Sequence, residues 1–215
     1  MDTHQAEVTA EEKETGRVEA FSDGVFSIAI TLLILELKVP KYNLSGPETP
    51  LFKALLQQWP SYLAYFISFF TILIMWVNHH RLFTHIKRTD NTFLFMNGFL
   101  LLWVAFVPFP TALLAEHIQR RDAVTATAFY TGTYVIIGLA FNLLWHYAIY
   151  HRRLLSRSAN AAAVHRITQS YLWGPPGFFL SFILAFFNVA LSLGTFTALA
   201  FFYAFTGEAK PSQKR

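Results

Sequence analysis

The chain has 215 residues, of which 54% are hydrophobic and only 14% are charged, and its formal net charge is +4. Soluble domains carry about 25% charged residues, so this composition excludes an ordinary soluble domain and is typical of a protein with several membrane spans. Cysteine is absent, which excludes disulfides and thiolate metal sites. Lysine and arginine lie in the connections between apolar runs, so we expect no nucleic-acid partner.

The N-terminal part of the chain predicts a retained first membrane helix. Residues 1–16 are polar, mostly acidic and unlike a signal peptide, and we expect them to lie in the cytoplasm. The first apolar run follows over 18–37. The connection 38–58 is rich in turn-forming proline and glycine. A second span is expected over 59–78, where the chain again lacks charge.

A basic connection separates the second predicted span from the third. It has the sequence HHRLFTHIKRTD and covers 79–90. The third span is expected over 91–115, with Pro108 and Pro110 breaking its far end, because proline lacks a backbone N–H group. A short polar loop at 116–122 closes this part of the chain.

The C-terminal half contains two long stretches without Asp, Glu, Lys or Arg. A fourth span is predicted over 123–150. The stretch 167–207 is also uncharged, and its WGPPG segment at 173–177 should break any helix. After that break, 178–206 forms either one long span or two short spans hinged near Asn188, and the sequence leaves both open.

The distribution of basic residues favours six spans with both termini in the cytoplasm, since cytoplasmic loops are enriched in lysine and arginine. Six spans place twelve of the 17 basic residues inside and five outside, whereas five spans would give nine and eight. The sequence therefore predicts an all-α integral membrane protein. Its single six-helix domain would cover 17–207, and a basic cytoplasmic tail would cover 208–215.

One carboxylate of the first predicted span falls at membrane depth. Twelve uncharged residues separate Asp23 from Glu36, and a helix of that length rises about 18 Å, too little to cross about 30 Å of hydrocarbon. Asp23, Ser27 and Thr31 are four residues apart and share one polar helix face. Such a carboxylate usually faces protein or water and has a partner. Asp23 therefore either caps the helix start with Ser22 or borders a hydrated path.

Two adjacent histidines, His79 and His80, follow the second predicted span at the level expected for Asp23. A histidine is an available partner for a carboxylate and titrates near neutral pH. The alternative is a pair of interface histidines anchored beside Trp76. Neighbouring residues on a helix point in different directions, and no cysteine or acidic ligand cluster accompanies this pair, so no metal site is predicted.

Four stretches resemble the endosomal and lysosomal potassium-channel family (the transmembrane protein 175 family) in its short bacterial form. They are RVEAFSD and AITLLILEL in the first predicted span, WVNHHRLF at 76–83 and FVPFPTALLAEH at 106–117. These stretches cover the first three spans, and the last three spans match mainly in hydropathy. The resemblance implies six transmembrane helices per subunit, a homotetramer, and a cation pore lined by four copies of the first helix.

The resemblance also implies roles for individual residues. Ile28 would form a hydrophobic constriction, with Leu32 and Leu35 as further apolar pore positions, since rings of such side chains can close a pore by dewetting. Thr31 would supply a layer of hydroxyl groups, with Ser27 beside it. Ordinary packing is the alternative for the apolar positions. A polar network would hold the helix in register, made of Arg17, Phe21, Ser22, Asp23, Trp76, His79 and His80.

The leading hypothesis is a passive channel with modest selectivity for potassium over sodium, in a prokaryotic plasma membrane. Its partners would be copies of itself, membrane lipids and permeant monovalent cations, and it would need no cofactor. The alternative is a proton-coupled transporter in which Asp23 and His79 relay protons. A membrane enzyme is disfavoured, because no spacing suggests a nucleophile elbow or a zinc-protease motif.

Overall fold

The computed structural model describes residues 3–40, 50–156 and 160–205, with side chains described between Thr15 and Ala204. Every regular element in these ranges is helical, apart from one antiparallel β-bridge between Ile86 and Leu155. The elements are α1 (Thr3–Leu32), the 3-10 helix η1 (Leu33–Glu36), α2 (Leu51–Gln57), α3 (Trp59–His85), α4 (Asn91–Phe106), α5 (Pro108–His117), α6 (Ala123–Ile149), the 3-10 helix η2 (Tyr150–Arg152), α7 (Ala161–Leu172), α8 (Gly174–Ala185) and α9 (Val189–Phe205).

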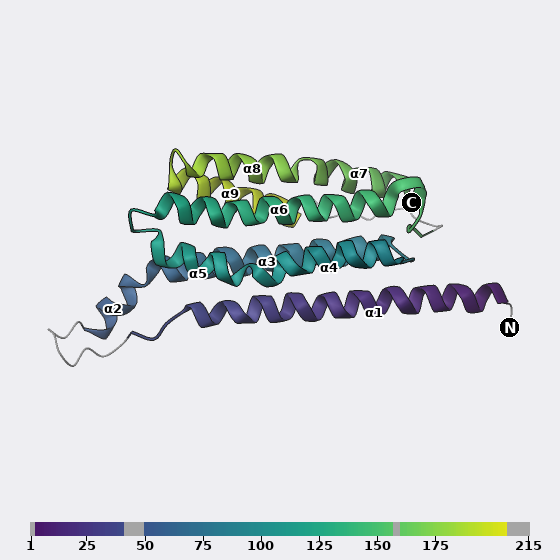
Figure 1. The fold of residues 1–215 in the computed structure, drawn as a ribbon, viewed down its shortest axis with the longest axis horizontal. Helices are drawn as coiled ribbons and strands as arrows, with labels where there is room; N and C mark the ends of the chain where they lie inside the picture. Colours follow the sequence, from purple (N-terminus) through teal and green to yellow (C-terminus); the bar gives the residue numbers. More distant parts are fainter. Residues whose placement is uncertain (1–2, 41–49, 157–159, 206–215) are drawn as a thin grey trace, which may run out of the picture.

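The long helices run roughly along one axis and form an elongated bundle in three layers (Figure 1). The first layer is α1, the second contains α3, α4 and α5, and the third contains α6 to α9. Four segments of the described chain are long and apolar enough to cross a membrane, which confirms the predicted membrane class. They are Thr15–Glu36, Trp59–His85, Asn91–His117 and Ala123–Arg152.

The first two predicted spans are longer in the structure than their apolar windows. Helix α1 begins at Thr3 rather than near residue 18, because the preceding segment is rich in Glu and also contains Ala, Gln and Lys, which favour helix. Helix α3 continues to His85, so the prediction of a connection beginning at residue 79 was wrong. The segment HHRLFTH contains neither proline nor glycine, and nothing local ends the helix there.

The predicted proline break lies where the sequence placed it. Helix α4 ends at Phe106 and α5 begins at Pro108, so a single residue, Val107, interrupts the third span. The N–H of Val107 donates to the carbonyl of Val104, which tightens this turn. The short helix α2 lies inside the predicted connection 38–58 and was not predicted.

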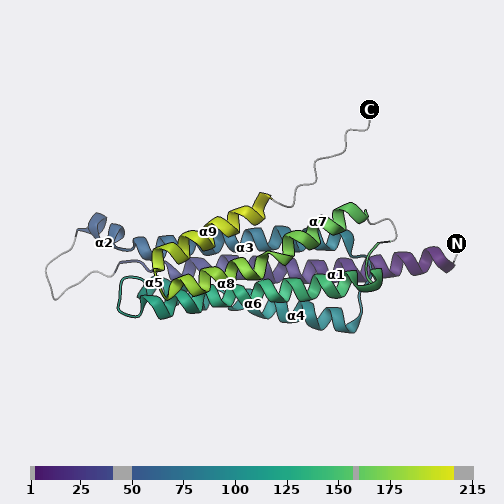
Figure 2. The same ribbon diagram turned by 90° about the horizontal axis from the view of Figure 1, so that it is seen from above.

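The C-terminal stretch forms a broken helix followed by a return helix. Helices α7 and α8 are separated only by Trp173, at the predicted WGPPG break, and they run nearly in line (Figures 1 and 2). The chain then turns and α9 packs back along α8, so 178–206 contains two helices rather than one. Asn188 lies at the turn and caps α9, since its side-chain oxygen accepts from the Leu191 N–H at 2.9 Å.

Paired serine hydroxyls join α8 to α9 close to this turn. The Ser181 hydroxyl donates to the carbonyl of Ser192 at 2.8 Å, and the Ser192 hydroxyl donates to the carbonyl of Ser181 at 2.7 Å. Both side chains are fully buried. Because each hydroxyl finds a partner on the other helix, the hairpin brings the two backbones close without leaving a buried donor unpaired.

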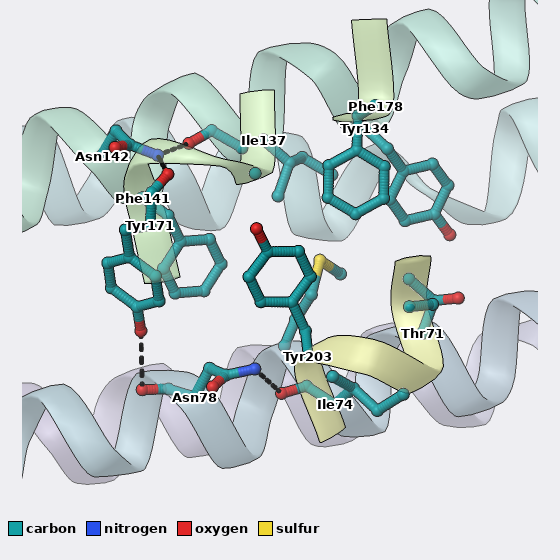
Figure 3. A pocket seen from close by; sticks show the side chains of 14 residues that line it. Thr71, Ile74, Asn78, Tyr134, Ile137, Phe141, Asn142, Tyr171, Phe178 and Tyr203 are labelled. Carbon is teal, nitrogen blue, oxygen red and sulfur yellow. Dashed lines mark hydrogen bonds between the residues drawn. The ribbon is translucent and has the colours of Figure 1, made fainter. Parts of the chain in front are cut away.

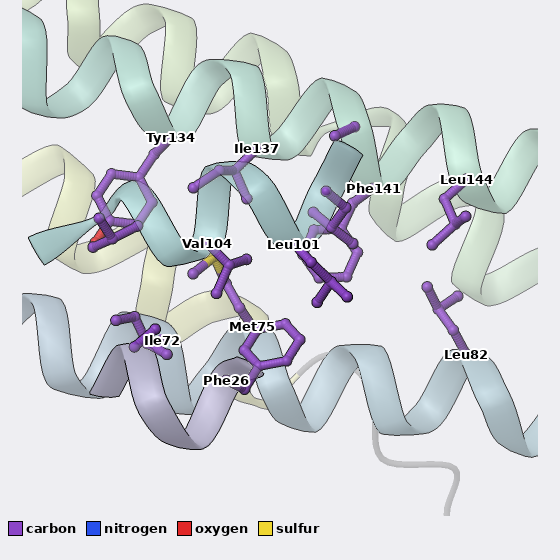
Figure 4. Packing of buried hydrophobic residues seen from close by; sticks show 14 of the residues in the cluster. Phe26, Ile72, Met75, Leu82, Leu101, Val104, Tyr134, Ile137, Phe141 and Leu144 are labelled. Atoms are coloured by element: carbon purple, nitrogen blue, oxygen red, sulfur yellow. The ribbon is translucent and has the colours of Figure 1, made fainter. Parts of the chain in front are cut away.

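The apolar core lies between the three layers (Figure 4). Helix α1 and the following η1 contribute only a narrow stripe to it. In this stripe Phe26 on α1 is 2% exposed and Leu33 on η1 is fully buried. Helix α6 contributes along most of its length. The cluster drawn in Figure 4 includes Phe26, Ile72, Met75, Leu82, Leu101, Val104, Tyr134, Ile137, Phe141 and Leu144. The remaining faces of α1 are therefore free of core contacts within the described part of the subunit.

Candidate functional site

Helix α1 has one face packed against the rest of the subunit. Ser22, Phe26, Ala29 and Leu33 recur at spacings of four, three and four residues, and each is at most 2% exposed. This spacing follows one face of an α-helix. The face contacts α3 and α4, which lie in the second layer.

The opposite face of α1, continued by η1 where Leu35 lies, carries the residues predicted to line a pore. The exposed fractions are 61% for Ile28, 41% for Leu32 and 68% for Leu35, and Ser27 and Thr31 are exposed as well. In a membrane protein, large apolar side chains that follow one helix face without contacts in their own subunit are covered either by lipid or by another copy of the chain. The structure thus brings all five residues to one side of the subunit.

The Thr31 hydroxyl is directed back along its own helix. Its oxygen lies 2.9 Å from the carbonyl oxygens of both Ser27 and Ile28, and it donates its proton to this pair. A threonine hydroxyl has one proton and two lone pairs. Because the proton is used within the helix, the lone pairs remain available on the exposed side.

A buried chain of hydrogen bonds joins α1, α4 and α3. The Ser22 hydroxyl donates to the Val18 carbonyl at 2.8 Å, and the Asn97 side-chain N–H donates to the Ser22 oxygen at 2.9 Å. The Asn97 amide oxygen then lies 2.9 Å from Nε2 of His79. An amide oxygen only accepts, so His79 Nε2 carries a proton and donates. His79 Nδ1 is buried and has no hydrogen-bond partner among the described residues.

Two further contacts, one helical turn apart, join α1 to α3. The indole N–H of Trp76 donates to Asp23 Oδ1 at 2.8 Å. His80 Nδ1 lies 2.7 Å from Glu19 Oε1, and a proton on that nitrogen donates to the carboxylate. The Trp76 and His80 rings stack with centroids 6.2 Å apart. Together these pairs fix the rotation of α1 against α3 at one end of the bundle.

The residues of the predicted polar network have different partners in the structure. Ser22 reaches His79 through Asn97, whereas Asp23 pairs with Trp76. His80 pairs with Glu19, and the adjacent histidines point in different directions, with His79 buried and His80 exposed. The two other network residues, Arg17 and Phe21, are exposed and take no part in these hydrogen bonds.

Sequence reasoning missed Asn97 and did not assign Glu19 to the network. Asn97 stands within an otherwise apolar part of the third predicted span, and such isolation is a usable signal for a buried polar contact. Glu19 precedes Asp23 by four residues, which places both carboxylates on the same face of the helix. The same spacing relates Trp76 to His80 on α3.

A third polar cluster holds the connection between α3 and α4 to the end of α6. Asp90 caps α4 by accepting from the Phe93 N–H, and it also accepts from the Tyr147 hydroxyl, both at 2.8 Å. Arg153 lies 3.3 Å from the same carboxylate. Burial alone would raise the pKa of Asp90, but these hydrogen bonds and the Arg153 charge hold it below its ordinary value.

This arrangement defines an all-helical membrane protein whose first helix is clamped by polar contacts on one side and unpaired on the other. Residues 17–108 match the family model described as endosomal/lysosomal potassium channel TMEM175. A potassium channel of Chamaesiphon minutus is 48% identical over 199 residues, which cover 93% of this chain and 98% of the relative. A potassium channel of Streptomyces collinus is 44% identical over 202 residues, covering 94% and 97%.

The crystal structure of a lysosomal potassium-selective channel TMEM175 homolog from Chamaesiphon minutus matches the fold with a TM-score of 0.83 and 47% identity. The match covers 92% of this chain and all of that chain. The chain therefore belongs to the TMEM175 family, which confirms the predicted resemblance. This is a family of ion channels and not an enzyme class.

Proposed function

We propose that this protein is a passive potassium channel whose pore is walled by the exposed face of α1 from several copies of the chain. The observation that carries this proposal is the exposure of Ile28, Thr31 and Leu35 on one face of a helix whose other face is packed. A single helix cannot enclose a pathway, so assembly is required. The names of the similar bacterial channels support potassium as the permeant ion.

The chemistry of the exposed face suits a monovalent cation. Rings of Ile28 and Leu35 side chains, with Leu32 next to them, would form narrow apolar zones that gate by dewetting. Between these rings, the free lone pairs of Thr31 would replace part of the hydration shell of the ion, with Ser27 beside them. A neutral lining favours weakly hydrated ions, which gives potassium a modest advantage over sodium.

The polar contacts on the other side of α1 would determine which face meets the pore. Rotating the helix by one residue would break the buried Ser22–Asn97 hydrogen bond and the Asp23–Trp76 hydrogen bond together. Each of these groups would then lie in an apolar environment without its partner, which is costly. The network therefore acts as a register device rather than as part of the conduction path.

We further propose six spans, formed by α1, α3, α4 with α5, α6, α7 with α8, and α9. Helix α9 has 17 residues and rises about 25 Å, close to the thickness of the hydrocarbon. Both termini would then lie in the cytoplasm of a prokaryotic plasma membrane, where the basic loops favour them. A homotetramer would place four copies of α1 around one axis, and conduction would need no cofactor.

Proton-coupled transport through Asp23 and His79 has less support from the contacts. Asp23 is bonded to Trp76 and His79 to Asn97, and no hydrogen bond joins the two proposed relay residues. A relay along this path would first have to break both contacts. Flux that requires a proton gradient and saturates with one solute would favour this alternative over the channel.

Reconstitution tests the channel proposal. Purified protein in liposomes should pass potassium down its gradient without any proton gradient. Thr31→Ala removes the hydroxyl layer and should lower the potassium-to-sodium permeability ratio several-fold, because a hydrogen-bonding or coordinating group contributes about 1 kcal/mol. Thr84→Ala is the matched control, since Thr84 is an exposed threonine on α3 whose hydroxyl also donates to a helix carbonyl. Absence of cation flux under every gradient would overturn the proposal.

A further inference from the structure

Arg81 is a half-buried cation that has no anionic partner among the described residues. Its Nη1 atom is buried and makes no hydrogen bond, and its side chain forms no ion pair with the residues that the structure describes. A guanidinium group is always charged and carries five N–H donors. Buried donors without acceptors are destabilising, so this group is expected to have an acceptor in the working protein.

An apolar cavity lies one helical turn from Arg81 along α3. Its volume is about 60 Å³, it lies between α3, α6, α7, α8 and α9, and side chains such as Ile74, Ile137 and Phe178 form its wall (Figure 3). On α3 the lining extends from Thr71 to Asn78, which corresponds to about 10 Å of helix. We call this cavity the slot, and its largely hydrocarbon lining suits an alkyl chain.

The polar groups that border the slot are already satisfied by the protein. The Asn78 amide donates to the Ile74 carbonyl at 2.9 Å, and the Asn142 amide donates to the carbonyls of Gly138 and Tyr171. Figure 3 shows the two amides at the end of the slot that lies toward Tyr171. These contacts leave a mainly hydrocarbon wall, and such a wall favours an apolar occupant.

The charged group and the slot lie on the same side of α3, because Thr71, Ile74, Asn78 and Arg81 recur at spacings of three and four residues. Arg81 follows Asn78 by three residues, about 4.5 Å along the helix axis. It also lies close enough to Tyr171, which lines the slot, for its charge to act on that side chain. The Tyr171 hydroxyl in turn donates to the carbonyl of Asn78 at 3.4 Å.

We propose that an anionic phospholipid occupies this surface, with its phosphate on Arg81 and the upper part of an acyl chain in the slot between α3 and α9. A guanidinium fork matches phosphate oxygens in a bidentate geometry, and basic pockets between membrane helices bind anionic headgroups. The two halves of the site require one molecule that carries both an anion and a long apolar chain. A membrane supplies this class at high local concentration.

Native mass spectrometry of the purified full-length protein tests the site. Wild-type protein in micelles is titrated with phosphatidylglycerol or phosphatidylcholine of equal chain length, and bound lipid is counted for each subunit. Wild type should bind phosphatidylglycerol at least about tenfold more tightly than phosphatidylcholine, as expected for a charge-assisted contact. Arg81→Gln should abolish that preference. Lys87→Gln should keep it, because Lys87 is an exposed basic residue just beyond the end of α3.

Three results would overturn the proposal. The first is an unchanged preference in Arg81→Gln. The second is equal binding of the two lipids by wild type. The third is that glycerol phosphate displaces bound phosphatidylglycerol as effectively as phosphatidylglycerol itself does. That result would show a site for free phosphate rather than for lipid. If Arg81→Gln fails to fold, Arg81→Lys keeps the charge without the fork and should weaken phosphatidylglycerol binding severalfold, and undiminished binding counts against the site. None of these results depends on whether α1 lines a pore.

Discussion

Helices α1 and α6 are both long and apolar, yet they relate to their own subunit in opposite ways. Within the most apolar window of each segment, 22% of residues are buried for α1 and 56% for α6. Helix α6 contacts α4, α5, α7, α8 and α9, which leaves a stripe that includes Leu139 and Leu143 exposed. Helix α1 touches the bundle on one side only. Hydropathy predicts that both helices cross the membrane, and burial shows that α1 leaves a larger share of its surface without contacts in its own subunit.

The largest expected difference concerns stability. Trp145 on α6 is fully buried and its indole N–H donates to Thr168 at 2.9 Å, so Trp145→Ala should lower the free energy of unfolding by about 3–5 kcal/mol. Ile28→Ala on the exposed face of α1 should cost about 0.5 kcal/mol or less. Denaturant unfolding in micelles measures the free energy of unfolding of both variants. Equal losses would mean that Ile28 is packed as closely as Trp145, and a difference in the loss between dilute and concentrated protein would assign that packing to contacts between copies.

The buried network should be the next most sensitive feature. Asn97→Ala leaves the Ser22 oxygen and His79 Nε2 without their shared partner, which should cost about 1–3 kcal/mol of stability. It should also reduce potassium flux, because α1 loses its register. Asn91→Ala, at the exposed start of the same helix, is the control. A stable Asn97→Ala protein with normal flux would contradict the role given to the network.

The smallest expected effect lies at Asp90 and depends on pH. The native contacts lower the pKa of Asp90 below its ordinary value of 3.8, so its charge stabilises the folded state above that pH. The stabilisation by the Asp90 charge should disappear as pH falls through the pKa that Asp90 has in the folded state, which lies below 3.8. At neutral pH Asp90→Asn should be less stable by about 0.5 kcal/mol, and the difference should vanish in acid. Melting curves from pH 7 to well below pH 3.8 would show this loss, and a difference that stays constant over the whole range would argue against the ion pair.

The sequence predicted those features that follow from local patterns. Uncharged runs located the first four spans, and the proline positions located the breaks at Val107 and Trp173. The spacing of Ile28, Thr31 and Leu35 placed these residues on one helix face, which the structure leaves exposed. Their role in a pore stays a prediction, because exposure in one subunit does not show what faces it.

Features that depend on contacts between distant segments could not be predicted. Ser22 and Asn97 are 75 residues apart, and no local pattern indicates that they meet. The extension of α3 to His85 was missed because a charged or polar residue ends an apolar window without ending a helix. Asn188 indicates the turn, because asparagine is a preferred N-cap residue. The apolar residues on both sides of it, however, also fit one continuous helix, so the sequence alone left both open.

The central claim concerns where α1 lies in the assembled protein. The most direct measurement is a structure of the assembly in a lipid environment, with the first helix located relative to the symmetry axis. Our account predicts that Ile28 and Leu35 from all copies point toward that axis around a narrow water-filled path, with Thr31 between them. An assembly in which both side chains contact lipid and no path runs between the copies of α1 would contradict it.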